Sequence, residues 1–105
     1  MILHIATFRW KDEVTEADVA DLTAALLAMA AAIPELRSYA AGTNLHLRPG
    51  GADYGVAAIV DDAAALDAYL DHADHKAVYE KHLGWMIAEG GRSAVQLPIA
   101  DGSFS

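Results

Sequence analysis

Ile2-Leu3-His4-Ile5-Ala6-Thr7-Phe8-Arg9-Trp10 constrains the fold more than any other segment of this 105-residue chain. It combines β-branched and aromatic residues with no glycine or proline, a composition typical of a β-strand. Successive side chains of a strand point to opposite faces. Both faces are largely apolar here, with Ile2, His4, Ala6, Phe8 and Trp10 on one and Leu3, Ile5, Thr7 and Arg9 on the other. The segment therefore predicts a strand that is covered on both sides.

A helix is predicted directly after this strand. Thr15-Glu16-Ala17-Asp18 places an acid three residues after a hydroxyl, the pattern of a helix N-terminus. Pro34 ends the helix, because proline disfavours helical geometry in the residue before it. Between these two signals an apolar stripe follows steps of three and four, at Val19, Leu22, Leu26, Met29 and Ile33.

Two strands that form a hairpin are predicted next. Residues 36–47 have strand composition interrupted near Gly42, where we expect a bulge or a close approach of another backbone. Residues 48–53 have the composition of a loop, and residues 54–60 form the following strand.

A divided helical region and a last strand complete the pattern. Residues 63–70 predict a short helix, and a second helix begins around Asp74 or His75 and runs to about Glu89. Gly90-Gly91 ends that helix, and residues 93–99 form the last strand.

The element order βαββαβ predicts one α+β domain over residues 1–105 with the ferredoxin-like arrangement. Its four-stranded antiparallel sheet would carry helices on one face only. The first strand is nevertheless apolar on the other side as well. We therefore expect a second copy of the chain to cover that side in a symmetric homodimer, with residues 101–105 fraying or swapping between the two copies.

Composition argues against several classes of function. The 15 acidic and 7 basic residues give a net charge of −8, which would repel nucleic acid and anionic membranes. The absence of cysteine excludes thiolate catalysis and cysteine-based zinc sites. The apolar strand follows Met1 with no basic region before it, so we expect no signal peptide and a cytoplasmic location.

Four groups of residues form an ordered signature along the chain. They are His4-Ile5-x-x-Phe8-x-Trp10-Lys11, then Val14-Thr15-Glu16, then Ile33-Pro34 with Gly42-x-Asn44, and finally Ala68-Tyr69-Leu70-Asp71-His72-Ala73-Asp74-His75. In this signature the chain resembles the stress-responsive A/B-barrel (Dabb) family of dimeric α/β-barrel proteins. It departs from the family at Ala73, where proline is usual, and at Val56, where several members have a histidine.

The resemblance implies a reactive pair. The family includes a polyketide cyclase in which the tyrosine and the last histidine of the final motif perform acid–base chemistry. By position these residues are Tyr69 and His75. The resemblance thus implies a cofactor-independent cyclase, lyase or isomerase, although most members have no established activity.

Tyr69 and His75 can act together only if the helix breaks between them, since a spacing of six separates their faces on one helix. Asp71, His72 and Asp74 are weak helix formers, and Asp74 is a good N-cap for a helix with His75 in its first turn. The helix dipole there disfavours imidazolium, which leaves His75 neutral and able to accept a proton. His75 would deprotonate a carbon next to carbonyls while Tyr69 donates to the oxygen, without metal or cofactor.

The same pocket is expected to bind a small apolar or aromatic molecule. His4 and His46 are predicted as its secondary polar groups, and its apolar wall is predicted to consist of Phe8, Leu26, Tyr79 and Met86.

A non-enzymatic stress-related dimer or ligand-binding module is the alternative. A cavity of about 300 Å³ or more reached by Tyr69 and His75 favours the enzyme, whereas a filled core favours the alternative. A metal site is disfavoured, because His72, His75 and His82 do not follow the i, i+4 spacing of ligands on one helix face. Haem binding by a histidine of this helix has no distinguishing residue.

Overall fold

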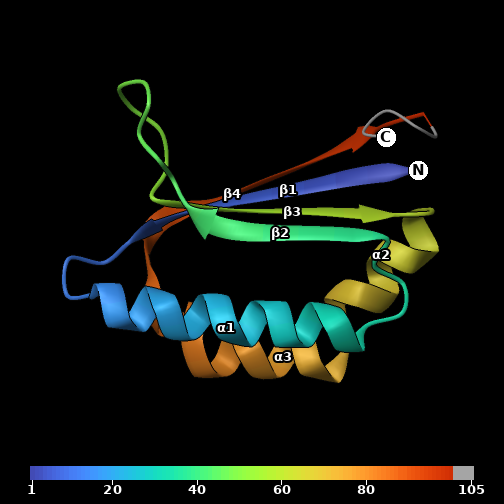
Figure 1. Ribbon diagram of the computed structural model, residues 1–105, viewed down its shortest axis with the longest axis horizontal. Coiled ribbons are helices and arrows are strands. Elements are labelled where there is room, and N and C mark those ends of the chain that lie inside the picture. Colours follow the sequence, from blue (N-terminus) through green and yellow to red (C-terminus); the bar gives the residue numbers. More distant parts are fainter. Residues whose placement is uncertain (101–105) are drawn as a thin grey trace.

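Residues 1–100, which the computed structural model describes, form a four-stranded antiparallel sheet with helices on one face (Figure 1). The strands are β1 (Ile2–Trp10), β2 (Ser38–Thr43), β3 (Tyr54–Val60) and β4 (Ile87–Pro98), in the spatial order β2-β3-β1-β4. The helices are α1 (Glu16–Ala32), α2 (Ala63–Leu70) and α3 (Ala73–Val78), the last continuing through a π-helical turn η1 (Tyr79–Leu83) into α4 (Gly84–Met86). The predicted ferredoxin-like fold is confirmed; the prediction for residues 101–105 lies outside the described residues.

β1 lies inside the sheet, paired with β3 on one side and β4 on the other. His4, Ala6 and Phe8 point toward the helices and are buried. Leu3 and Ile5, on the opposite face, are only partly covered. The strand has the predicted bounds, and within residues 1–100 only its helix side is fully covered.

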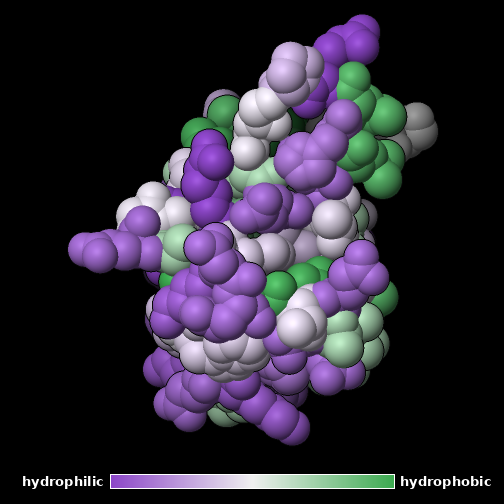
Figure 2. All heavy atoms as spheres, turned by 90° about the vertical axis from the view of Figure 1, so that its left-hand side faces the viewer, coloured by the Kyte–Doolittle hydropathy of each residue, from purple (hydrophilic) through white to green (hydrophobic). Residues whose placement is uncertain are grey.

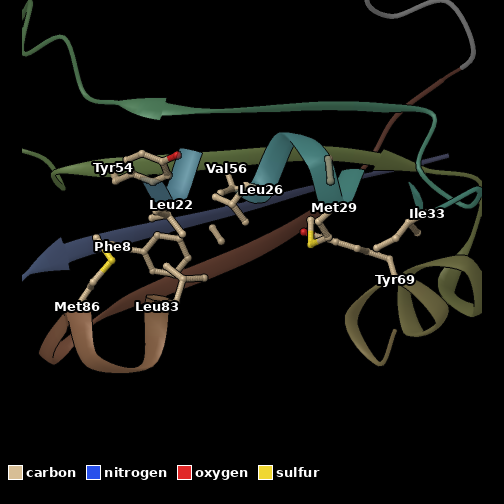
Figure 3. Packing of buried hydrophobic residues seen from close by; sticks show 12 residues of the cluster. Phe8, Leu22, Leu26, Met29, Ile33, Tyr54, Val56, Tyr69, Leu83 and Met86 are labelled. Atoms are coloured by element: carbon tan, nitrogen blue, oxygen red, sulfur yellow. The ribbon is translucent and has the colours of Figure 1, made fainter. Parts of the chain in front are cut away.

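α1 begins and ends where its local signals predict. The side chain of Thr15 accepts a hydrogen bond from the Asp18 backbone, and the Asp18 carboxylate accepts one from the Thr15 backbone. Ile33 is extended at the C-terminal end, immediately before Pro34. Figure 3 shows the core that the apolar stripe of α1 completes, from Tyr54, Phe8 and Met86 at one end to Ile33 and Tyr69 at the other.

β2 is shorter than predicted, and the irregularity expected near Gly42 is absent. Gly42 pairs in regular register with Gly55 of β3. The chain leaves the sheet at Asn44, whose side chain donates to the Ala52 carbonyl at 2.7 Å and accepts from the His46 backbone at 2.8 Å. These local bonds close a loop over residues 44–53 and so end the strand early.

The end of the last helix was also predicted wrongly. The helical region stops at Met86 instead of Glu89, and β4 starts at Ile87. Gly90, with φ of 69°, and Gly91 lie inside the strand where its register against β1 shifts between Phe8 and Trp10. A Cβ on Gly91 would lie 2.9 Å from the carbonyl oxygens of both Ala88 and Arg9. The glycine pair therefore permits a bulge with close backbone contact and does not cap a helix.

The sheet face opposite the helices remains apolar and uncovered. Val95 and Leu97 of β4 are 47% and 41% exposed, and they pair with Ile5 and Leu3 of β1. The loop 44–53 projects on this side of the sheet (Figure 1), and its Leu45 and Leu47 are 79% and 77% exposed. In the view of Figure 2 a group of apolar residues lies at the upper right, beside polar residues, whereas polar residues cover most of the helical layer. No helix within residues 1–100 has both the length and the apolar character to cross a membrane.

Candidate functional site

The helical region breaks between Tyr69 and His75, as joint action of these residues requires. α2 ends at Leu70 and α3 begins at Ala73. The N-cap of α3 is His72 and not Asp74, since the His72 Nδ1 atom accepts from the Asp74 backbone at 3.1 Å. His72 therefore binds the backbone at the break, and the predicted cap at Asp74 is wrong. His75 still falls within the first turn of α3.

The break brings four rings from four elements together. The Tyr69 and His75 ring centroids lie 5.1 Å apart in an edge-on arrangement. His4 of β1 and Tyr39 of β2 each meet Tyr69 with centroids 6.3 Å apart, also edge-on. All four rings line one cavity between the sheet and the helices.

This cavity measures about 30 Å³, which is room for about one water molecule. It is far below the size that would favour an enzyme, so the described conformation is nearly filled. Phe8, Leu26 and Tyr79 line it as predicted, together with His4. Met86 lies elsewhere in the core, and His46 lies in a separate surface hollow of about 390 Å³ with Trp10 and Glu16.

Both histidines of the cavity favour the neutral form. Burial lowers the pKa of His75 below its usual value of 6.5. A hydrogen bond to the Leu70 backbone raises that pKa in part, and the nearby positive charge of Arg92 lowers it further. Burial, followed by Arg92, lowers the pKa of His4 in the same way. A neutral imidazole has one nitrogen able to accept a proton. His75 keeps that nitrogen free beside its hydrogen bond to the Leu70 backbone, whereas Nδ1 of His4 already contacts the Gln96 amide, so His75 is the ring that can act as a base.

The two phenols remain protonated. Burial is the main cause that raises the pKa of Tyr39, and the adjacent Tyr69 phenol adds to it. Burial also raises the pKa of Tyr69, while its interaction with Tyr39 opposes the shift. The two phenols thus influence each other electrostatically, yet the buried Tyr39 hydroxyl has no partner in full hydrogen-bond geometry among residues 1–100. Such an unpaired group destabilises the fold and is available to a ligand.

Three polar residues of this region were missed from the sequence. Tyr39 and Arg92 line the cavity, and Gln96 holds the His4 ring through a contact of 2.9 Å from its Nε2 atom to Nδ1. Alternation along β2 could have placed Tyr39 on the helix side. Arg92 was hidden by the wrong start of β4, and Gln96 becomes visible only through the register that sets it opposite His4.

Metal ligation is not apparent in the described part of the chain. Residues 1–100 contain no group of three or more potential side-chain ligands placed to hold an ion. His72 is already engaged by the Asp74 backbone.

The fold and the cavity define a ferredoxin-like α+β protein with a small, largely apolar chamber between its sheet and its helices. The chain belongs to the Stress responsive A/B Barrel Domain (Dabb) family, whose model matches residues 2–88. The resemblance found in the sequence is thus confirmed.

Several known proteins resemble this chain in sequence or in fold. The uncharacterized protein SCO4036 of Streptomyces coelicolor is 33% identical over 94 residues, which cover 85% of this chain and 97% of the relative. A dimeric ferredoxin-like protein of unknown function from Thermobifida fusca is 43% identical, with a TM-score of 0.85 over 93% of this chain and 90% of that chain. Hydroxynitrile lyase from Passiflora edulis is 13% identical, with a TM-score of 0.78 over 95% of this chain and 94% of that chain. The last similarity shows the fold alone.

Proposed function

We propose that this protein is a homodimer that binds a small, largely apolar, oxygen-bearing molecule between Tyr39, Tyr69 and His75, and transfers a proton on it. The observation that carries the proposal is the buried Tyr39 hydroxyl, which lacks a full hydrogen bond in the described part of the chain, beside two neutral histidines. A ligand oxygen would satisfy that hydroxyl. His75 would then accept a proton from carbon while Tyr69 donates to the oxygen.

The wall of the cavity supports a ligand of this kind. Phe8, Leu26, Val56 and Leu83 supply apolar surface around the polar rings. Apolar walls with a few convergent polar groups are the usual composition of small-molecule sites. Tyr79, 42% exposed, and the partly buried Leu70 also line the cavity, and movement of α2 and α3 away from the sheet would enlarge it at these two residues.

The dimer part of the proposal rests on the uncovered sheet face. Leu3, Ile59, Val95 and Leu97 supply an apolar surface on that face, and a second sheet packed against it would remove this surface from water. The exposed leucines of the loop 44–53 lie on the same side of the sheet. The Thermobifida fusca protein with this fold is dimeric.

The small cavity specifically favours a second candidate function. At about 30 Å³ it accommodates a water molecule and no organic substrate unless the helices move. In that case the protein would be a dimeric, non-enzymatic module. The two candidates differ in whether the chamber opens and whether protons move there.

Deuterium uptake by phenylacetone in D₂O, followed by ¹H NMR, tests proton transfer. We expect the wild-type protein to accelerate exchange at the benzylic carbon above the buffer rate. His75→Ala should lower the protein-dependent rate by about 100-fold, the usual loss when a general base is removed. Tyr69→Phe should also lower it, because the oxygen loses its donor.

His82→Ala provides the matched control, since His82 lies in η1 and does not line the cavity. It should exchange at the wild-type rate. A rate unaffected within about twofold by His75→Ala would exclude His75 as the base. Saturable binding of the ketone without any exchange would favour the non-enzymatic candidate.

A further inference from the structure

Arg92 and Arg37 differ in their charge pairing. Arg37 forms two contacts of 2.8 Å with the Asp61 carboxylate, a surface ion pair. Arg92 lines the cavity, and no acidic side chain pairs with it among residues 1–100. This absence is notable in a chain with 15 acidic and 7 basic residues. The Arg92 guanidinium can therefore bind an anionic ligand at the cavity.

His4 presents a second donor to the same space. The amide nitrogen of Gln96 can only donate, so His4 Nδ1 at 2.9 Å accepts the hydrogen bond. The proton of the neutral ring must then lie on Nε2. Because Gln96 sits directly opposite His4 in the pairing of β1 with β4, the sheet register holds this tautomer in place.

The cavity lining as a whole favours a ligand that accepts hydrogen bonds. Among residues 1–100 it contains Arg92, the Nε2–H group of His4 and the Tyr39 hydroxyl as donors, but no aspartate or glutamate. Tyr69 and His75 also line it, and the rest of the surface is largely apolar, from residues such as Phe8 and Leu26. A planar carboxylate on a small apolar body complements these features, because a guanidinium binds a carboxylate through two parallel hydrogen bonds.

We propose that the ligand of this site is a small aromatic or aliphatic carboxylic acid, bound as the carboxylate, whose charged group is held by Arg92 with His4 as the second donor. This inference rests on the proposed small-molecule site and names the chemical class of its ligand. The carboxylate would lie at the rim, where Arg92 is exposed to solvent, with the apolar body toward Phe8 and Leu26. The negative net charge of the protein makes adventitious binding of anions elsewhere less favourable.

Two fluorinated probes of nearly equal shape test the inference. The affinities of 4-fluorobenzoate and 4-fluorobenzamide are measured by ¹⁹F NMR titration of the full chain. We expect the wild-type protein to bind the benzoate about tenfold or more tightly, because only the benzoate forms a charge-assisted pair. Arg92→Gln should reduce benzoate affinity by about the same factor and leave the benzamide nearly unchanged.

Arg48→Gln removes the same charge from an exposed loop and should alter neither affinity. Val56→Phe fills the cavity and should weaken both probes; circular dichroism establishes that this variant is folded. Equal wild-type affinities for the two probes, or a benzoate preference that survives Arg92→Gln, would overturn the inference while leaving a small-molecule site intact. Failure of both probes to bind would instead overturn the proposed site and the ligand class together.

Discussion

Tyr39 carries a buried hydroxyl whose hydrogen-bonding capacity is not satisfied by its surroundings among residues 1–100. Its hydroxyl is buried without a full hydrogen bond among residues 1–100, whereas the buried Tyr54 hydroxyl shares a 2.7 Å hydrogen bond with Thr23. We predict that Tyr39→Phe raises the free energy of unfolding by about 1 kcal/mol, because an unsatisfied polar group is removed. Tyr54→Phe, the matched control, should lower it by about 1 kcal/mol. Urea unfolding measures both changes.

The two outcomes for Tyr39 separate a structural role from a ligand-binding one. If Tyr39→Phe is more stable but binds the ligand more weakly, the Tyr39 hydroxyl serves ligand binding at the expense of stability. A loss of stability similar to that of Tyr54→Phe would show that the Tyr39 hydroxyl has a hydrogen-bond partner in solution.

His75 should make stability depend on pH. Its folded-state pKa is lowered, chiefly by burial, so the unfolded chain binds the proton more readily than the folded chain. Its stabilising contribution is fully present above the unfolded pKa of about 6.5 and is lost as the pH falls below it toward the folded pKa. We predict that the free energy of unfolding decreases between about pH 7 and pH 5 and that His75→Gln reduces this slope.

His4 should act in the same direction, because burial lowers its pKa as well. Adding His4→Gln to His75→Gln should therefore flatten the profile further. Chemical denaturation at several pH values gives the slope directly. A His75→Gln profile as steep as that of the wild type would contradict the assignment of a half-buried neutral imidazole at residue 75.

At the scale of elements, the bulge in β4 depends on Gly91. A Cβ there would lie 2.9 Å from two backbone oxygens, and backbone atoms cannot rotate away as a side chain can. We predict that Gly91→Ala destabilises the protein by about 2 kcal/mol, the typical effect of overpacking. Glu89→Ala, at a nearby exposed position of β4 that already has a Cβ, should change the stability by less than about 0.5 kcal/mol.

Thermal or urea unfolding of the two variants compares them under the same conditions. A Gly91→Ala variant as stable as the wild type would mean that β1 and β4 separate easily at the bulge. Since Arg92 directly follows Gly91, such freedom would also loosen the cavity.

The elements also show which local signals suffice for prediction. The capping box at Thr15 and the stop at Pro34 act within a few residues, and α1 has the predicted extent. The break between α2 and α3 follows equally from weak helix formers, yet the choice of His72 over Asp74 as N-cap depends on side-chain geometry that composition does not specify. Gly90-Gly91 was misread because glycine serves both helix ends and strand bulges.

For the whole molecule, we expect the uncovered sheet face to determine assembly. We predict that the wild-type chain of 11.1 kDa sediments as a species of about twice that mass. Val95→Lys places a charge on the apolar face and should yield the monomer, because burial of an unpaired charge is strongly unfavourable. Asp21→Lys, on the exposed side of α1, should remain dimeric. Sedimentation velocity at micromolar concentration distinguishes the species.

A monomeric wild-type protein at that concentration would contradict the dimer. It would also leave the apolar side of β1 without an explanation. A dimer that persists in Val95→Lys would place the interface on another surface.

Local patterns in the chain were sufficient for the strand and helix types, the ferredoxin-like order, the family, and the proximity of Tyr69 to His75 across a helix break. These features depend on alternation, capping and helix-breaking residues, whose effects extend over only a few neighbours. The tertiary structure alone decided that the cavity is nearly closed and that Tyr39, Arg92 and Gln96 surround it. The His4–Gln96 contact joins residues 92 positions apart and exists only because β1 and β4 pair in one register. Such register and packing depend on all layers of the molecule at once, so no local pattern along the chain encodes them.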